Sequence, residues 1–328
     1  MHIHPMWDEL PDINKQLSEC ILLIKEKTTI ENKAIQDTIF QLLDSGGKLL
    51  RPAYFLLFSK LGNIEKQNHQ QLIAAAASTE VLHLATLIHD DIIDDSVTRR
   101  GVETVQSQYG KDVAVYAGDL LLSVYFDLLA DATESTEAIK LNALSMKRLL
   151  LGELEQKINT YNIDITFRQY LRSVKGKTAQ LFELSCFEGA YWGKASPEVI
   201  KKSSQIGHHI GIAFQMLDDI LDYSQSSNIL AKPVLEDVKQ GVYSLPLILA
   251  LQENKQAFIP LLSKKTEMTP ADIDQVVSLI EHYQGLKKAH EIAAYYTKKA
   301  LEIISKLPDC PEKEILYQLT RTLLNRNF

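Results

Sequence analysis

The sequence predicts an all-α protein, built as a single large helical bundle around a central cavity. Glycine and proline are scarce, with 14 and 10 copies among 328 residues, and long windows carry apolar residues at three- and four-residue spacing. No alternating strand pattern adjoins a hairpin turn, so we expect no β-hairpin. Because no long or low-complexity linker interrupts the chain, one domain is expected over residues 1–328.

The expected helices follow this periodicity in chain order. The clearest windows cover residues 72–88, 120–129, 141–158 and 276–304. Two helix starts are marked by a hydroxyl side chain before a proline, at Ser196-Pro197 and Thr269-Pro270. The hydroxyl caps free amide groups, and proline fits the first helical turn. The expected breaks lie at residues 45–47, 99–101, 161–166, 222–233, 254–260 and 307–311.

Composition excludes several classes of protein. The net charge of −7 and the pI near 5.8 argue against a nucleic-acid-binding surface. Cys20, Cys186 and Cys310 are widely spaced without a CxxC pair, which favours free thiols in a reducing compartment. No secretory signal pattern is visible, and no stretch approaches 18 uninterrupted apolar residues. We therefore expect a cytoplasmic protein, for which transient contact with a membrane surface remains open.

An acidic pentapeptide occurs twice, as DDIID at residues 90–94 and as DDILD at residues 218–222. Both copies follow apolar, helix-like segments. Residues four apart share a helix face, so the first and last aspartates of each copy form a carboxylate pair whose charges repel. If the two helices face each other across a cavity, these pairs would hold several Mg²⁺ ions and, through them, a polyphosphate. The pairs are Asp90 with Asp94 and Asp218 with Asp222.

A solvated acidic helix end is the competing interpretation, and for a lone DDxxD it would be favoured. Here the apolar stretch before Asp90 has no polar face wide enough to be an outer surface, and the motif recurs. Both observations favour a metal site. Gln215, one turn before Asp218, is either a buried amide satisfied by backbone or a hydrogen bonder beside the metals.

Basic residues interleave with the acidic motifs. GGKLLRP at residues 46–52 places a lysine and an arginine three residues apart on one helical face, and KGKT at residues 175–178 joins ammonium and hydroxyl groups. Neither is a Walker loop, because GxxxxGK[ST] is absent. Together these cations are sufficient for two diphosphates. They are Lys48, Arg51, Arg99, Arg100, Lys177 and Lys232.

In their order along the chain, these motifs resemble those of the trans-isoprenyl diphosphate synthases, the polyprenyl synthetase family, in its medium- to long-chain branch. The resemblance extends from about Gly46 to Pro246. It rests on GGKxxRP at 46–52, HDDxxD at 89–94, Arg99-Arg100-Gly101, Gly118-Asp119, GELEQ at 152–156, Lys177-Thr178 and FQxxDDxxD at 214–222. It implies the isoprenoid synthase fold and an enzyme that condenses isopentenyl diphosphate with an allylic diphosphate of the farnesyl or geranylgeranyl class.

The resemblance also implies roles for individual residues, with three Mg²⁺ ions holding the allylic diphosphate. The metal ligands would be Asp90, Asp94 and Asp218, with Asp222 as a further candidate. The catalytic residues would be Asp90, Asp91, Asp94, Lys177, Asp218 and Asp219. The allylic diphosphate would also contact Arg99, Lys177, Thr178, Gln215 and Lys232. Isopentenyl diphosphate would bind Lys48, Arg51, His83 and Arg100.

Product length is predicted from the residues just before Asp90. Short-chain members of the resembled family commonly carry Phe or Tyr at the fourth or fifth position before the first aspartate, where this chain has Thr86 and Ala85. Without an aromatic floor there, we expect a product longer than geranylgeranyl diphosphate, of heptaprenyl length or a neighbour, for a quinone side chain. Tyr125 and Phe126 are either a lower floor or ordinary core.

Three alternatives remain open. A class I terpene cyclase shares one Asp-rich site but lacks a second diphosphate site. A non-catalytic metal-binding bundle of the di-iron type is suggested by the ExxH of Glu80 and His83, yet no second ExxH occurs in the sequence. The third alternative concerns the assembly of a prenyltransferase. The chain is either a homodimer, as the resemblance implies, or the catalytic half of a heterodimer with a small regulatory subunit.

Overall fold

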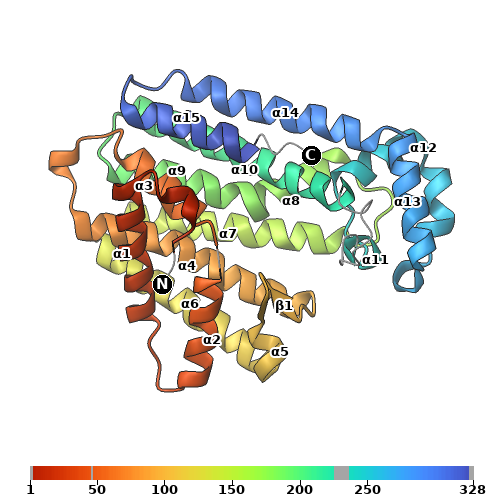
Figure 1. The fold of residues 1–328 in the computed structure, drawn as a ribbon, viewed down its shortest axis with the longest axis horizontal. Helices are drawn as coiled ribbons and strands as arrows, with labels where there is room; N and C mark the ends of the chain where they lie inside the picture. Colours follow the sequence, from red (N-terminus) through yellow and green to blue (C-terminus); the bar gives the residue numbers. More distant parts are fainter. Residues whose placement is uncertain (1–2, 46, 225–235, 325–328) are drawn as a thin grey trace. The chain divides into compact units, whose positions relative to one another are not determined.

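Helices form almost all of the regular structure, which confirms the predicted all-α class (Figure 1). The computed structural model describes residues 3–45, 47–224 and 236–324. The elements are η1 (Pro5–Trp7), α1 (Pro11–Lys27), α2 (Lys33–Asp44), α3 (Leu50–Ser59), η2 (Ile64–Lys66), α4 (His69–Ile93), β1 (Thr98–Arg99), β2 (Val102–Glu103), α5 (Val105–Tyr109), α6 (Lys111–Ala132), α7 (Thr136–Ile158), α8 (Phe167–Val174), η3 (Lys175–Ala179), α9 (Gln180–Trp192), α10 (Pro197–Ser224), α11 (Glu236–Lys239), α12 (Leu245–Leu262), η5 (Lys265–Glu267), α13 (Pro270–His282), α14 (Gly285–Ile304) and α15 (Pro311–Leu324).

Two compact units make up the chain. Unit 1 comprises Met1–Asn142 and Ser185–Ser203, and unit 2 comprises Ala143–Leu184 and Ser204–Phe328. The first acidic motif belongs to unit 1 and the second to unit 2. A single domain over residues 1–328, with the two Asp-rich helices facing each other, stays a prediction.

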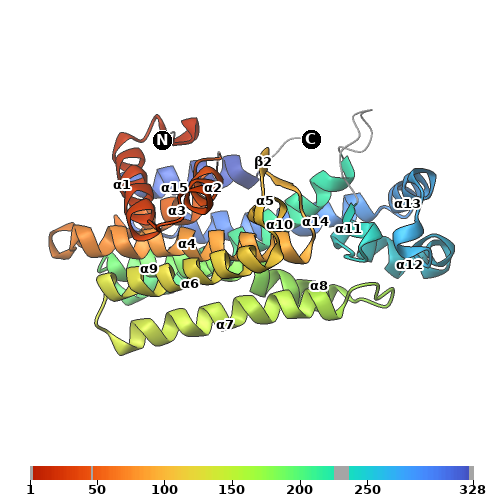
Figure 2. The same cartoon turned by 90° about the horizontal axis from the view of Figure 1, so that it is seen from below.

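The core of unit 1 is built on α4, which lies side by side with α6 (Figures 1 and 2). Asn68 caps the start of α4, because its side chain accepts a hydrogen bond from the amide of Gln71 at 3.2 Å. The helix then buries an unbroken run of side chains from Leu72 to Leu82. Four consecutive alanines within this run, at residues 74–77, let neighbouring helices approach closely.

Within the part of the chain that the structure describes, two helices, α4 and α6, are long and apolar enough to cross a membrane by length and composition. In α4, 78% of the apolar window is buried within the structure, so its composition is that of a core helix. In α6 the buried share is 44%, and Tyr116 and Phe126 are among its exposed large apolar side chains. Phe126 is thus a surface residue, whereas Tyr125 is fully buried and belongs to the core.

The prediction that the chain contains no hairpin was wrong at residues 98–103. There β1 pairs with β2 in antiparallel register, with Thr98 opposite Glu103. The turn residues Arg100 and Gly101 both have positive φ, 52° and 79°. This backbone matches the right-handed twist of the strands and suits glycine, but an arginine gives no sequence signal for it.

In unit 2 the predicted helix start at Thr269-Pro270 is confirmed, and a capping box joins the side chains of Thr269 and Asp272 to each other's backbone. The predicted break at residues 254–260 was wrong in extent. Helix α12 continues to Leu262 and contains Pro260, and only Asn254 leaves helical geometry, with φ −153° and ψ 82°. The helix is therefore kinked at that residue.

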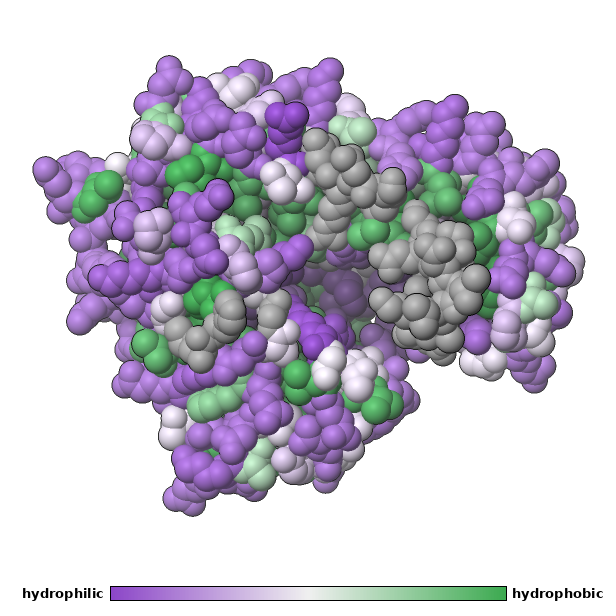
Figure 3. Space-filling model, viewed as in Figure 1, coloured by the Kyte–Doolittle hydropathy of each residue, from purple (hydrophilic) through white to green (hydrophobic). Residues whose placement is uncertain are grey.

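The surface of the protein carries both charged and exposed apolar side chains. The face in Figure 3 is mostly hydrophilic, in keeping with a charged content of 23%. In unit 2, helix α7 exposes large apolar side chains with a spacing that places them along one side. We call these the α7 stripe: Leu144, Leu151, Leu154 and Ile158.

A carboxyl group is buried in the core of unit 1. The Asn142 amide donates to Glu188 Oε1 at 2.5 Å and accepts at Oδ1 from the Tyr125 hydroxyl at 2.8 Å. Glu188 Oε2 is buried and has no hydrogen-bond partner among the described residues. Burial raises the pKa of Glu188 to about 7 from its ordinary value of 4.5, and the Asn142 bond offsets only part of that rise.

The raised pKa predicts that stability depends on pH. The folded state holds the Glu188 proton more tightly than the unfolded state, so the contribution of Glu188 to stability is fully present below pH 4.5 and is lost as the pH rises through about 7. The loss amounts to about 3 kcal/mol. Glu188→Gln, which mimics the protonated acid, should match the wild type at pH 4.5 and exceed its unfolding free energy at pH 8. Denaturant titrations across this range test the prediction, and parallel curves for the two proteins would contradict it.

Candidate active site

The first acidic motif lies at the carboxyl end of α4. The helix ends at Ile93, and the amide of Asp94 donates to the carbonyl of Asp90 at 2.9 Å. A helix carboxyl end already carries a partial negative charge, so each carboxylate there is disfavoured by about 0.3–1 kcal/mol. Asp90 is half-buried and Asp94 exposed. Oxygen donors in this arrangement suit a hard divalent cation.

Asp91, between them, faces the protein. Its side chain is buried, and Oδ1 accepts a hydrogen bond from Arg99 Nε at 2.7 Å. Burial raises the pKa of Asp91, and the Arg99 guanidinium opposes that rise. The pair links α4 to the β1–β2 hairpin, which carries Arg100 at its turn. Catalytic and phosphate-binding roles for Asp91 and Arg99 stay predictions.

His89, directly before the motif, packs on α6. A Cβ added to Gly118 would lie 2.4 Å from His89 Nε2, so only glycine leaves space for the imidazole there. The same nitrogen lies 3.3 Å from Asp119 Oδ1. Gly118 and Asp119 therefore form the part of α6 on which the His89 side chain packs.

His83 also belongs to α4, and arginine side chains from other segments lie near it. Burial lowers the pKa of His83 well below its ordinary value, and the nearby charges of Arg51, Arg100 and Arg99 lower it further. Arg100 also lies against Gly47, because a Cβ on Gly47 would lie 2.6 Å from its Nη1. Unit 1 thus brings together the loop that carries Lys48 and three other predicted binders of isopentenyl diphosphate. We call Arg51 and Arg100, together with His83, the cation cluster.

Glu80 belongs beside this cluster and was missed as a site residue. It is buried one turn before His83. Burial raises its pKa, and the charges of Arg51 and Arg100 lower it. The ExxH spacing is the available signal in the sequence, but there it points to an iron ligand. Its environment identifies Glu80 as a countercharge for the arginines.

In unit 2 the KGKT segment forms a π-helix, η3, between α8 and α9. Such wide turns are rare and are frequent at functional sites. Here two glycines bring the backbones together, since a Cβ on Gly176 would lie 2.5 Å from Gly152 Cα. The close approach of Gly176 to Gly152 places Lys177 beside the GELEQ segment of α7. Its Nζ lies 2.9 Å from Glu153 Oε2 and 3.2 Å from Gln156 Oε1.

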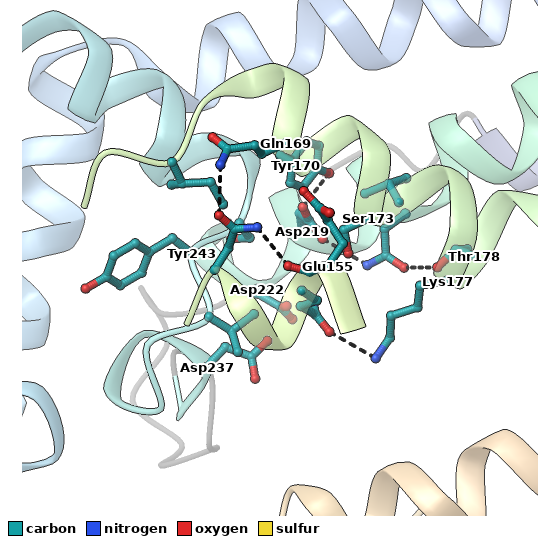
Figure 4. Close-up of a pocket in the computed structure, with 17 residues that line it drawn as sticks. Glu155, Gln169, Tyr170, Ser173, Lys177, Thr178, Asp219, Asp222, Asp237 and Tyr243 are labelled. Atoms are coloured by element: carbon teal, nitrogen blue, oxygen red, sulfur yellow. Dashed lines mark hydrogen bonds between the residues drawn. The ribbon is translucent and has the colours of Figure 1, made fainter. Parts of the chain in front are cut away.

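A pocket opens beside Lys177 and encloses about 680 Å³ of empty space, part of it open to solvent (Figure 4). Helices α7, α8 and α10 supply most of its walls. The predicted site residues Lys177, Thr178, Gln215, Asp219 and Asp222 line it. Amides from Gln156, Asn159 and Gln169 line it as well.

Asp219 anchors this wall. Its Oδ2 accepts from the Tyr170 hydroxyl at 2.6 Å and from the amide of Leu245 at 3.2 Å, and its Oδ1 accepts from Gln215 Nε2 at 2.9 Å. Gln215 Oε1 in turn accepts from the Thr178 hydroxyl at 2.6 Å. The network joins α8, α10 and the start of α12. Gln215 is therefore a link within the protein. Its amide keeps a second N–H and a second oxygen lone pair, so the contact with substrate stays a prediction.

We predict that Asp219→Asn lowers stability. The carboxylate accepts three hydrogen bonds at its two oxygens, whereas asparagine offers one acceptor oxygen, so either the Gln215 side chain must turn over or a buried donor loses its acceptor. The cost is about 1–3 kcal/mol, which lowers the melting temperature by several degrees. Asp274→Asn, the same substitution at an exposed aspartate of unit 2, serves as the control and should melt close to the wild type. Equal melting of both variants would contradict the assignment of Asp219 as the anchor.

Asp218 is half-buried, and Asp222 lines the pocket together with Asp237 (Figure 4). Burial raises the pKa of Asp222 to about 7, and the Asp237 carboxylate raises it further. Asp237, which lies in the short helix α11, was missed because one aspartate in such a segment gives no signal. Lys232 lies outside the described residues.

Among the residues described, no three His, Cys, Asp or Glu side chains form a metal site by themselves. The carboxylate pairs nevertheless offer the oxygen donors that Mg²⁺ prefers.

The chain is similar to known proteins over most of its length. A family model described as Polyprenyl synthetase matches residues 32–281. A prenyl transferase of Cyanophora paradoxa is 34% identical over 290 residues, 88% of each chain. Heptaprenyl diphosphate synthase component 2 of Geobacillus stearothermophilus is 29% identical over 324 residues, 98% of this chain and 97% of the relative. The crystal structure of a geranylgeranyl pyrophosphate synthase from Lactobacillus brevis superposes with a TM-score of 0.94 at 46% identity, covering 98% and 99% of the two chains.

Proposed function

The chain belongs to the polyprenyl synthetase family and is a prenyltransferase, and from this premise we propose that it condenses isopentenyl diphosphate with an allylic diphosphate. The primer would be of the farnesyl or geranylgeranyl class, and the product an all-trans polyprenyl diphosphate. Family members depend on Mg²⁺, and we propose that three ions bind with the allylic diphosphate.

One observation carries the proposal. Unit 1 holds a carboxylate pair at the end of α4 and, two turns earlier on the same helix, His83 with the cation cluster around it. Carboxylates suit a diphosphate that is bound through metal ions, whereas guanidinium groups bind a diphosphate directly. Two modes of binding in one unit support two diphosphate substrates. A terpene cyclase needs only the first.

The proposed reaction begins with loss of the allylic diphosphate. When bound, Mg²⁺ supplies Lewis acidity that stabilises the departing negative charge. Asp90, Asp94 and Asp218 would hold the ions, with Asp222 as a further ligand. Lys177, already oriented by Glu153 and Gln156, would add positive charge at the leaving group.

The cation cluster would then hold isopentenyl diphosphate beside the allylic cation. A neutral His83, which its lowered pKa favours, can donate one hydrogen bond to a phosphate oxygen without adding charge. The alkene of isopentenyl diphosphate forms the new carbon–carbon bond, and a proton then leaves, in our proposal to the released pyrophosphate. Positioning and exclusion of water supply the rest of the catalysis.

We propose a product longer than geranylgeranyl diphosphate, of heptaprenyl length or a neighbour, for a quinone side chain. Ala85 is fully buried and Thr86 half-buried below Asp90, and neither side chain is large enough to block a growing tail. The name of the Geobacillus stearothermophilus relative supports heptaprenyl length. The 46% identity to a geranylgeranyl pyrophosphate synthase favours the shorter product, so product sizing decides between the two.

We further propose that the protein works as a dimer. The α7 stripe, about half exposed, is an apolar helix side that a second chain would cover. A homodimer is the simpler case. The designation "component 2" of one relative favours a heterodimer with a small regulatory subunit. A cytoplasmic location, with transient membrane contact at product release, belongs to the same proposal.

The test is an assay of the purified chain with Mg²⁺, farnesyl diphosphate and labelled isopentenyl diphosphate, followed by product sizing. Elongation that needs both diphosphates and stops with chelator would support the proposal. Hydrocarbon release from the allylic diphosphate alone would support a cyclase instead. Activity that appears only after a partner subunit is added would support the heterodimer.

A further inference from the structure

The N-terminal segment of unit 1 reaches the loop that carries Lys48. Helix η1 is short, and His4 caps it by accepting from the amide of Met6 at 3.2 Å. Trp7 at its end is fully buried. Its indole Nε1 donates to the carbonyl of Lys48 at 2.8 Å, across 41 residues of sequence.

The bonded carbonyl lies at a strained point of the backbone. Leu49, the next residue, has a φ of 49°, in the left-handed region that a leucine seldom adopts. Such a residue costs about 1–3 kcal/mol and persists only where its surroundings hold it. The same residue is the N-cap of α3, which has no side-chain capping bond, and Arg51 lies in the first turn of α3. The peptide group between Lys48 and Leu49 therefore sets both the position of Lys48 and the start of the helix that carries Arg51.

We propose that Trp7 is a positioning residue for the isopentenyl diphosphate site. Its indole N–H fixes the Lys48–Leu49 peptide and, through it, the relative placement of Lys48 and Arg51. This inference rests on the proposed function, because it takes those two residues as binders of isopentenyl diphosphate. It assigns a task in substrate binding to a residue far from every acidic and basic motif in the sequence.

The test compares Trp7→Phe with Trp192→Phe. Phenylalanine keeps an aromatic ring but removes the indole donor, and the chain contains only these two tryptophans. Trp192 also belongs to unit 1 and is almost as deeply buried, at 9% exposure. Loss of one hydrogen bond should raise KM for isopentenyl diphosphate about 3- to 10-fold in Trp7→Phe and leave KM for the allylic diphosphate within twofold. Trp192→Phe should change neither. An equal rise in both constants, or no rise in a folded Trp7→Phe protein, would overturn the inference.

A second measurement needs neither turnover nor a stable Trp7→Phe protein. In Trp192→Phe, Trp7 is the sole tryptophan, so its emission reports on the Lys48 loop. Isopentenyl diphosphate added alone should change that emission in a saturable way, whereas inorganic pyrophosphate with Mg²⁺ should change it much less. Saturable binding, measured by calorimetry, without any change in emission would overturn the role of Trp7. Absence of isopentenyl diphosphate binding to the wild type would instead refute the proposed function.

Discussion

Replacing Asp90 by asparagine is expected to lower kcat by about 10²–10³-fold, because it removes a charged ligand from the ions that stabilise the leaving diphosphate. The variant should also need more Mg²⁺ for half-maximal activity. Its fold should survive, since Asp90 is half-buried at a helix end where its negative charge is unfavourable. Steady-state rates over a Mg²⁺ titration and a thermal melt measure both effects.

The matched control is Asp95→Asn, the same substitution at the aspartate that follows the motif. Asp95 is exposed and pairs with Lys111 at the surface, a type of ion pair worth little. Its activity should stay within about twofold of the wild type, a change close to the resolution of such an assay. If Asp90→Asn kept wild-type activity and an unchanged Mg²⁺ requirement, the first motif would not be a metal site.

A phenylalanine at Thr86 is expected to change the product rather than the rate of the first condensation. Thr86 lies one turn before Asp90, and its hydroxyl bonds to the carbonyl of His83 at 2.8 Å, so its side chain remains close to the helix. An aromatic ring there would obstruct a tail that extends below the metals. We expect the wild-type product to be replaced by shorter ones, of farnesyl to geranylgeranyl length. Chromatography of the dephosphorylated products measures the shift.

Two further variants test the direction of the tail. Leu87→Phe adds the same ring one residue along, about 100° around α4, and should leave product length unchanged. Leu82 lies one turn further from Asp90 on the same side of α4. Leu82→Phe should therefore give products whose length is intermediate between those of Thr86→Phe and the wild type. Equal product lengths for all three variants would contradict a tail that runs along this face of α4. Ala85→Phe is a harsher test, because Ala85 is fully buried and overpacking would cost stability.

Local patterns predicted the motifs and most helices, but the window expected at residues 276–304 is two helices, α13 and α14, separated at Gln284, whose φ is 58°. The apolar spacing, the capped start at Thr269 and the repeated DDxxD depend on residues close together in sequence. The hairpin was missed because Arg100 adopts a left-handed conformation that its residue type does not announce. A full break was predicted after Asn254 because Pro260 suggested one, whereas the structure has only a kink at Asn254.

The distinction between aspartates within a motif was beyond sequence reasoning. Asp90 and Asp91 are the same residue type side by side, yet burial and the Arg99 contact turn only the second towards the protein. Asp219 differs from Asp218 in the same way, through Tyr170 and the start of α12. Trp7 depends on a contact across the fold and carries no pattern that points to the site, whereas the ExxH pattern of Glu80 points to an iron ligand instead. Burial and distant partners decide these roles, and neither is encoded in local spacing.

The wide turn at η3 constrains how this part of the gene can change length. A π-helix accommodates one residue more than an α-helical turn, so α9 keeps nearly the rotational phase that a continuous α-helix would give it. Deleting one residue within 175–179 would restore regular helical geometry and leave the later side chains of α9 close to their present orientation. The change would fall on the turn itself, where Lys177 would lose its place beside Glu153 and the close approach of Gly176 to Gly152 would be altered. A single-residue deletion at this position should therefore preserve the fold and impair the site.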